Sequence, residues 1–375
     1  LELLDSLLSE QPGTFKERAL KGMTLAAQGN GTPAIELFEA LHAERPDHAE
    51  GTRALVKALE RSGDTGRAEE VLRISLRHAE DVEDEGLARW RMELLTHLMR
   101  TGSWETLAAE ARGPAETPES PLHVQAFLMY VEALHRTDRS RKALEFLAAA
   151  DRDRIPVHRV RSKEVEILAE LDRQEESERQ LAELASASDP ASILAAAEVY
   201  QRRQRWADAV PLLTRALEMS SDSIHVRYWL GAAYERSGNR QRAAETFRAL
   251  LRLDPSYAPA LNYLGYMWAE QGEHLDEAVE MVDRAVAMEP DNGAYVDSLG
   301  WAHFQRGDNG VALALLERAA RLLPNDAVIF EHLGDVYART GSAEQARASY
   351  RRAVELDGEN REEVRRKLDG LGQDN

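Results

Sequence analysis

The chain has 375 residues, with 47 Lys and Arg against 66 Asp and Glu, a net charge of −19, 43% hydrophobic residues and no Cys. It is too apolar for a disordered chain, and without thiols it is neither a disulfide scaffold, a thiolate metal site nor a cysteine-nucleophile enzyme. Nucleic acid and bare anionic membrane are unfavourable partners for so acidic a chain, because both are bound mainly through Lys and Arg. The sequence also lacks an apolar run near the roughly 20 residues that span a bilayer.

Residues 1–8 already have the apolar spacing of an amphipathic helix. The chain begins with Leu1 rather than Met, and no basic and then apolar leader follows. We therefore expect residues 1–14 to be the truncated leading helix of a longer protein. A targeting signal or lipid anchor would then lie in the missing part.

Self-similarity is clearest in the C-terminal third of the chain. Four Leu-Gly pairs end in Gly231, Gly265, Gly300 and Gly334, which are spaced 34, 35 and 34 residues apart. A second glycine follows seven residues after each of them. An Ala comes next in every unit, and a Pro closes three of the four. A fixed period of this length indicates stacked repeats.

Each unit is predicted to be two helices joined by a tight turn. Residues such as Val226, Leu230 and Tyr234 are spaced to form one buried stripe on the first helix. The mid-unit glycine, for example Gly238, falls where a helix ends in a left-handed residue, which glycine adopts without steric cost. The Ala of the second helix allows the two helices to approach closely, and the terminal Pro ends that helix.

This pattern resembles the tetratricopeptide repeat, a 34-residue helix–turn–helix unit. The resemblance implies an all-α, right-handed α-solenoid (superhelix) of about ten such repeats. It is strong for four well-formed units at 224–358 and weaker elsewhere. We expect N-terminal repeats at 15–121 with a Pro-rich break near 110–121, degenerate middle repeats at 122–223, and a capping helix and tail at 359–375. The break would be a bend, a domain boundary or an extended loop between repeats.

Catalytic signatures are missing from the sequence. It contains no phosphate-binding glycine loop, zinc-protease motif, nucleophile elbow or EF-hand loop. The 11 His residues are scattered, and Asp and Glu are too numerous for one pair to stand out. We therefore predict no enzyme activity, no cofactor and no metal. Basic residues at 152–163 and 202–205 are interpreted as partners of neighbouring acidic residues, with docking of an acidic segment as the alternative.

A candidate binding strip follows from the family resemblance, which implies that ligands lie along the exposed face of successive first helices. Tyr228, Tyr266, Trp301 and Phe304 fall outside the packing stripe, so we expect their rings to be exposed for recognition; the alternative is that they pack against adjacent repeats. Replacing Tyr266 and Trp301 by Ala should then weaken binding with little effect on unfolding. The peptide- or partner-binding residues predicted are His225, Tyr228, Asn262, Tyr266, Asp297, Trp301, Phe304 and Arg339, with Glu235, Glu270, Gln305, Glu331 and Asp335 on the same face.

The function predicted is a non-catalytic scaffold or adaptor that binds a protein or peptide along the concave groove. The alternative is a regulatory or targeting region of a longer protein whose catalytic domain or anchor lies outside this chain, and a homo-oligomeric structural element is a third reading. The runs at 262–266 and 297–301 are similar to the C-terminal halves of bacterial envelope repeat proteins, many of them lipoproteins or periplasmic adaptors. The resemblance and the absence of Cys favour the periplasm or envelope, with the cytoplasm as the alternative.

Overall fold

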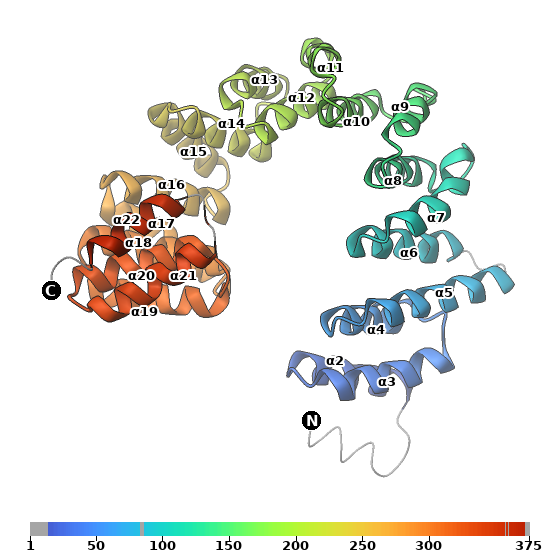
Figure 1. Ribbon diagram of the computed structural model, residues 1–375, viewed down its shortest axis with the longest axis horizontal. Coiled ribbons are helices and arrows are strands. Elements are labelled where there is room, and N and C mark those ends of the chain that lie inside the picture. Colours follow the sequence, from blue (N-terminus) through green and yellow to red (C-terminus); the bar gives the residue numbers. More distant parts are fainter. Residues whose placement is uncertain (1–13, 83–85, 357, 359, 372–375) are drawn as a thin grey trace. The chain divides into compact units, whose positions relative to one another are not determined.

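A computed structural model describes residues 14–82, 86–356, 358 and 360–371. Within these residues the chain forms 21 helices, α2 to α22, and no strand (Figure 1). The helices follow one another as ten pairs and a final single helix, and the two helices of a pair pack on each other. The all-α, repeat-built fold predicted from the sequence is confirmed. The leading helix expected at 1–14 lies almost entirely outside the described residues.

Contacts divide the chain into two units, Leu1–Leu184 and Ala185–Asn375. The first unit contains five helix pairs, of which α2–α3, α4–α5 and α6–α7 stack in succession (Figure 1). Its helices are α2 (Phe15–Ala27), α3 (Gly31–Glu44), α4 (Ala49–Arg61), α5 (Thr65–Asp81), α6 (Leu87–Thr101), α7 (Trp104–Glu116), α8 (His123–Arg136), α9 (Ser140–Ala148), α10 (Val157–Glu170) and α11 (Gln174–Ser186), the last of which ends just past the boundary.

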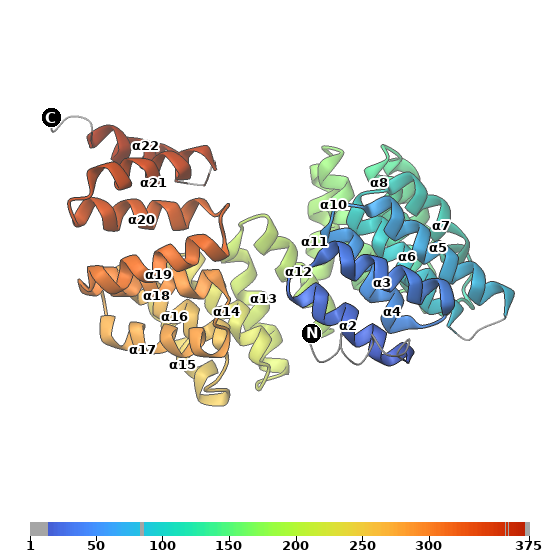
Figure 2. The same cartoon turned by 90° about the horizontal axis from the view of Figure 1, so that it is seen from below.

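The second unit contains the other five pairs and the final helix. Figure 2 shows α20, α21 and α22 side by side at its C-terminal end. Its helices are α12 (Pro190–Arg202), α13 (Trp206–Met219), α14 (Ile224–Arg236), α15 (Arg240–Leu253), α16 (Ala258–Gln271), α17 (Leu275–Met288), α18 (Gly293–Arg306), α19 (Asn309–Leu322), α20 (Ala327–Arg339), α21 (Ala343–Glu355) and α22 (Arg361–Gly370).

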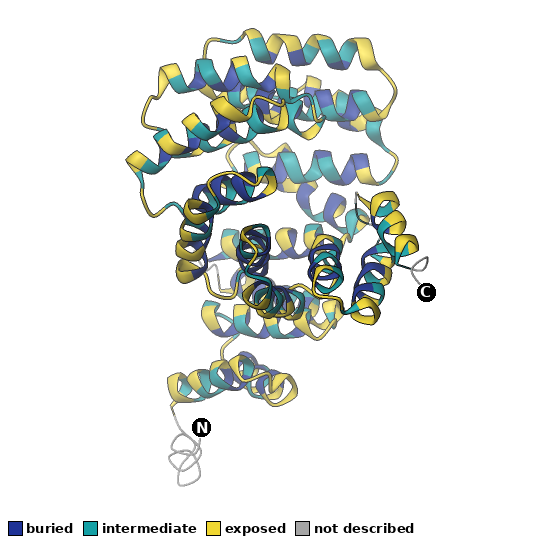
Figure 3. Cartoon of the chain, turned by 90° about the vertical axis from the view of Figure 1, so that its left-hand side faces the viewer, coloured by how far each residue is buried: buried dark blue, intermediate teal, exposed yellow. Residues whose placement is uncertain are grey.

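Buried side chains form stripes on the helix sides that face other helices, while exposed residues gather on outer faces and at helix ends (Figure 3). In the first unit one continuous core runs from Leu25 to Ile167. Several smaller clusters make up the core of the second unit, each shared by neighbouring helices. This is the packing expected of a repeat array, in which each unit buries its apolar face against the next.

The turn within each helix pair depends on one left-handed residue. The predicted glycines adopt it, with φ of 85° at Gly238 and 99° at Gly307. Three pairs without a glycine use another residue at the same place: Asp138, Asp172 and Gln204 have φ between 56° and 58°. The degenerate repeats therefore keep the turn geometry although they lost the glycine that signals it.

Close packing of the two helices in a well-formed unit depends on the glycine of the Leu-Gly pair as well as on the Ala. A Cβ atom on Gly231 would lie 2.8 Å from the Phe247 ring, and one on Gly300 would lie 2.8 Å from Leu316. These distances are too short for non-bonded carbon atoms, so the glycine of the first helix makes room for a large side chain of the second. The sequence analysis assigned this role to the Ala alone.

Arginines on second helices connect neighbouring repeats. Arg284 donates to the carbonyl oxygen of Pro255 at 2.6 Å, and Arg352 donates to that of Pro324 at 3.3 Å. Arg318 makes the same bond to Pro290. Each arginine thus bonds to a carbonyl in the turn that follows the preceding second helix, two residues after that helix ends.

The Pro-rich segment near 110–121 is helical over part of its length. Helix α7 continues through Pro114 and ends at Glu116, and residues 117–122 are not helical. Pro114 is tolerated because it lies in the last turn, where its missing N–H removes one bond without breaking a longer helix. The boundary between the two compact units falls later, at 184/185.

Candidate functional site

Five of the eight predicted binding residues lie at least partly at the surface of the second unit. His225 on α14 and Arg339 on α20 are exposed. Tyr228 on α14 and Asn262 and Tyr266 on α16 are half-buried. The Oδ1 atom of Asn262 is enclosed and has no hydrogen-bond partner among the residues that the structure describes.

The other three predicted residues, all on α18, are buried, which corrects the expectation that these rings are exposed. Trp301 and Phe304 retain 8% and 4% of their surface, and Asp297 retains 7%. The rings pack with each other at a centroid distance of 5.1 Å, and the Arg339 guanidinium lies 3.4 Å above the Phe304 ring. α18 packs against both α16 and α20, which accounts for the burial of these three side chains.

Asp297 is part of a buried ion pair with His332 of α20. The Nδ1 atom of His332 donates to Oδ1 of Asp297 at 2.9 Å, and its ring stacks on Trp301 at 4.0 Å with an interplanar angle of 15°. Burial alone lowers the pKa of His332, but the Asp297 carboxylate and its hydrogen bond outweigh burial, and the pKa is raised. The nearby Glu270 and Asp335 act in the same direction.

A cluster of aromatic side chains forms where α14 meets α16. The ring of Tyr228 lies 5.9 Å from that of Tyr257 and 6.0 Å from that of Tyr263, and His225 lies 6.2 Å from Tyr257. We call these four residues the tyrosine cluster. His225 is exposed, and the three tyrosines are half-buried. Tyr257 and Tyr263 were not among the predicted binding residues, although Tyr263 directly follows Asn262 in the sequence.

The hydroxyl groups of Tyr228 and Tyr263 remain protonated near neutral pH. Tyr263 donates to the Glu235 carboxylate at 3.0 Å. Burial, followed by the negative charge of Glu235, raises the pKa of Tyr263 well above its usual range. Burial also raises the pKa of Tyr228. Tyr228 and Tyr263 therefore contribute neutral hydroxyl groups rather than charges to the cluster.

A second acidic group lies at the C-terminal end of the unit. The Lys367 ammonium of α22 lies 2.9 Å from Glu331 and 2.8 Å from Asp335, both on α20. Tyr350 donates to Asp335 at 2.7 Å. Glu331 and Asp335 were predicted on the ligand face, but both already contact Lys367 of the final helix.

The basic residues at 152–163 find acidic partners nearby. Arg161 pairs with Glu183 at 2.8 Å, and Lys163 pairs with Glu132 at 2.6 Å. In the described part of the chain there is no group of three His, Asp or Glu side chains that could hold a metal ion. The helices of that same part include none with the length and apolar character to span a membrane.

Comparison with known proteins gives a repeated match to one family. A model described as tetratricopeptide repeat matches residues 20–82, 194–258, 231–295, 269–327 and 298–361. These matches together cover more than half of the chain.

Individual relatives match over shorter stretches. The TPR repeat-containing protein PA4667 of Pseudomonas aeruginosa is 26% identical over 139 residues, which are 37% of this chain and 23% of that protein. A probable UDP-N-acetylglucosamine–peptide N-acetylglucosaminyltransferase, SPINDLY of Solanum lycopersicum, is 28% identical over 94 residues, 25% of this chain and 10% of that protein. The chain thus spans less than a quarter of the length of these curated relatives.

Solved structures show similar helical repeats at low sequence identity. A tetratricopeptide repeat protein from Parabacteroides merdae is 14% identical, with a TM-score of 0.48, and the match covers 76% of this chain and 99% of that one.

Proposed function

This chain belongs to the tetratricopeptide repeat family, and on that premise we propose that it is a non-catalytic scaffold or adaptor for protein partners. In this proposal a peptide or partner protein lies along the first helices of the second unit. Members of the family commonly bind proteins, and the chain carries no recognisable catalytic motif.

The tyrosine cluster is the observation that carries the proposal. Tyr228, Tyr257 and Tyr263 are half-buried and lie beside the exposed His225. Tyrosine contributes large contact area with few rotatable bonds and a hydroxyl for hydrogen bonding, which is why it is enriched at interfaces. Asn262 and Tyr266 extend the same surface along α16. Tyr266 packs against the buried cluster that contains Trp301 and Phe304.

The test compares two neighbouring positions on α14. His225→Ala combined with Tyr228→Phe removes the imidazole of His225 and the hydroxyl group of Tyr228 but keeps the Tyr228 ring. Trp229→Ala is the control, because Trp229 is the next residue and is 42% exposed. Wild type and both variants are immobilised and incubated with lysate of the source organism, and retained proteins are identified by mass spectrometry.

A protein retained by wild type and the Trp229 variant, but lost with the cluster variant, would support the proposal and identify the partner. Equal retention by all three would move the binding surface away from the cluster. Circular dichroism of each variant checks that helix content is unchanged.

A location in the bacterial envelope is part of the proposal, with the cytoplasm as the alternative. It is supported by the similarity of residues 262–266 and 297–301 to bacterial envelope repeat proteins and by the absence of Cys, which suits an oxidising compartment. Fractionation of source cells, followed by immunoblotting with an antibody against this chain, tests the location. Recovery in the cytoplasmic fraction alone would contradict it.

A second candidate function is a regulatory or targeting region of a longer protein. The partial match to SPINDLY, which is named as a probable glycosyltransferase, favours this alternative because the match covers 10% of that protein. Sequencing the gene on both sides of these 375 codons separates the two functions. A catalytic domain in the same reading frame would establish the alternative.

A further inference from the structure

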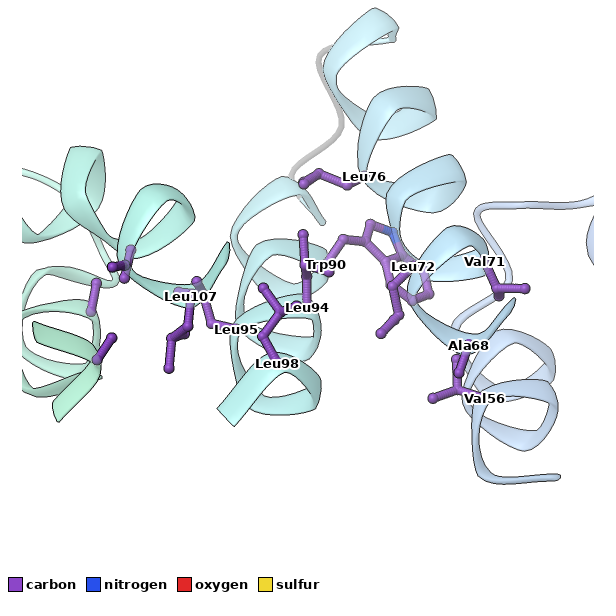
Figure 4. Close-up of a cluster of buried hydrophobic side chains, with 14 of the residues drawn as sticks. Val56, Ala68, Val71, Leu72, Leu76, Trp90, Leu94, Leu95, Leu98 and Leu107 are labelled. Atoms are coloured by element: carbon purple, nitrogen blue, oxygen red, sulfur yellow. The ribbon is translucent and has the colours of Figure 1, made fainter. Parts of the chain in front are cut away.

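The first unit contains a cleft of about 670 Å³ between α4, α5 and α6. This volume falls in the range of about 300–1,000 Å³ typical of ligand-binding clefts. Val56 and Leu72 contribute apolar surface to it, and Figure 4 shows both within the core that joins these three helices. The remaining lining is polar, and most of its charged side chains are basic.

Three basic residues form a stripe along α4. Arg53, Lys57 and Arg61 are spaced four residues apart, which places them on one face of the helix, and all three are exposed. Arg100 of α6 lines the opposite side of the cleft. Like charges at this spacing repel each other by a few tenths of a kcal/mol per pair in a helix. The stripe therefore carries a cost that the fold does not explain.

The acidic residues of the cleft are already occupied. Arg53 pairs with Glu93 at 3.0 Å, and Arg100 pairs with Glu60. Among the residues that the structure describes, Lys57 and Arg61 have no ion-pair partner. The cleft therefore has an excess of positive charge, although the chain as a whole has a net charge of −19.

Glu60 also contacts His97 of α6, which is 1% exposed. The Nδ1 atom of His97 lies 2.6 Å from the Glu60 carboxylate, and its Nε2 atom lies 3.2 Å from the carbonyl oxygen of Thr65. Glu60 thus contacts both His97 and Arg100, and Glu93 contacts Arg53. Both acidic residues that line the cleft are therefore engaged by groups other than Lys57 and Arg61.

We propose that this cleft binds an acidic peptide segment of a protein partner. Carboxylates of the segment bind Lys57 and Arg61, and an apolar side chain of the segment packs on the surface that Val56 contributes to the cleft. Charge complementarity selects this occupant: the cleft is basic and open, while the net acidity of the chain disfavours the polyanionic backbone of nucleic acid. The surface is separate from the tyrosine cluster, so each can bind or fail to bind independently of the other.

The experiment measures fluorescence anisotropy of a fluorescein-labelled peptide that alternates Asp or Glu with Leu. Its counterpart carries Asn or Gln in place of the acids. The cleft variant is Lys57→Glu with Arg61→Glu. The matched control is Arg77→Glu with Arg141→Glu, because it changes the net charge equally at two exposed arginines outside the cleft.

We expect the full chain to bind the acidic peptide, with affinity falling at higher salt. The cleft variant should lose at least about tenfold in affinity, which corresponds to about 1.4 kcal/mol, while the control variant stays within about twofold of wild type. Lys57→Gln with Arg61→Gln should give an intermediate loss. It also guards against misfolding caused by the added acids, and its helix content is checked by circular dichroism.

Four results would overturn the proposal. Equal losses in the cleft and control variants would mean non-specific charge attraction, and equal binding of the amide peptide would mean that carboxylates are not recognised. Displacement of the peptide by an oligothymidylate at lower concentration than by unlabelled peptide would identify a nucleic-acid site. A mass that rises with concentration in light scattering and becomes constant in the cleft variant would make a second copy of this chain the occupant.

Discussion

The Nδ1 atom of His332 on α20 lies 2.9 Å from Oδ1 of Asp297 on α18, which is the first helix of the preceding repeat. The same relationship recurs along both units: a carboxylate on one first helix bonds to a donor on a neighbouring first helix, and the donor lies on the later helix in every pair except Glu170–His135. α22 takes the place of a next first helix at the end of the chain. The other pairs are Glu60–His97, Glu132–Lys163, Glu170–His135, Glu235–Tyr263 and Glu331–Lys367.

The His332–Asp297 pair predicts a pH-dependent contribution to stability. The folded-state pKa of His332 is raised above its ordinary value of 6.5, so the pair stabilises the fold fully below pH 6.5 and loses this contribution as the pH rises through the raised pKa. In urea unfolding, the free energy of unfolding of Asp297→Asn should therefore lie furthest below that of wild type near pH 6. The difference should narrow by about pH 9. A gap that is constant over this range would mean that His332 is neutral in the folded protein.

Replacing Trp301 by Ala should destabilise the second unit by about 3–5 kcal/mol. The ring is 8% exposed and stacks on His332, so its removal leaves a cavity beside a buried ion pair. The expectation from the sequence, that Trp301→Ala with Tyr266→Ala hardly affects unfolding, therefore fails at Trp301. Chemical denaturation followed by circular dichroism measures the loss, with Trp229→Ala as an exposed control expected within about 0.5 kcal/mol of wild type.

How far the sequence predicts this molecule depends on which residues carry the signal. Gly238, Gly272, Gly307 and Gly341 locate the turns of the well-formed repeats, because a left-handed residue at that place is most readily a glycine. Asp138 and Asp172 occupy the same place in the degenerate repeats. Without a glycine there, the spacing of apolar residues did not locate the boundaries of these repeats.

Burial on the ligand face was harder to predict. The helical spacing of Trp301 and Phe304 predicts that they lie outside the stripe that packs within their own repeat. It says nothing about the neighbouring first helices, which cover them here. That burial depends on how tightly α16, α18 and α20 pack, and the side chains that set this distance are spread over three repeats. The predicted binding role of the eight residues remains a prediction.

Removing the charge of Lys367 should lower the free energy of unfolding at the C-terminal end of the array. Glu331 is 7% exposed and would keep Asn360 as a partner at 3.3 Å after Lys367→Met. Because a poorly compensated carboxylate remains in the interior, we expect a loss of about 2–3 kcal/mol. Arg366→Met is the matched control, since Arg366 is exposed and donates to a carbonyl of its own helix. Equal effects of the two substitutions in urea unfolding would contradict the role assigned to Lys367.

The left-handed turn residues allow a reciprocal test in adjacent repeats. Gln204 has φ of 56°, a conformation that costs a residue with a Cβ about 1–2 kcal/mol. Gln204→Gly removes this cost but gives the unfolded chain more freedom, so we expect a net gain of about 0.5–1 kcal/mol. Gly238, with φ of 85°, occupies the next turn, and a Cβ there would meet no atom within 4 Å. Gly238→Ala should therefore lose about 1 kcal/mol through backbone strain alone. Both changes are measured by urea unfolding, and shifts of the same sign would show that backbone conformation does not determine the choice of residue at these turns.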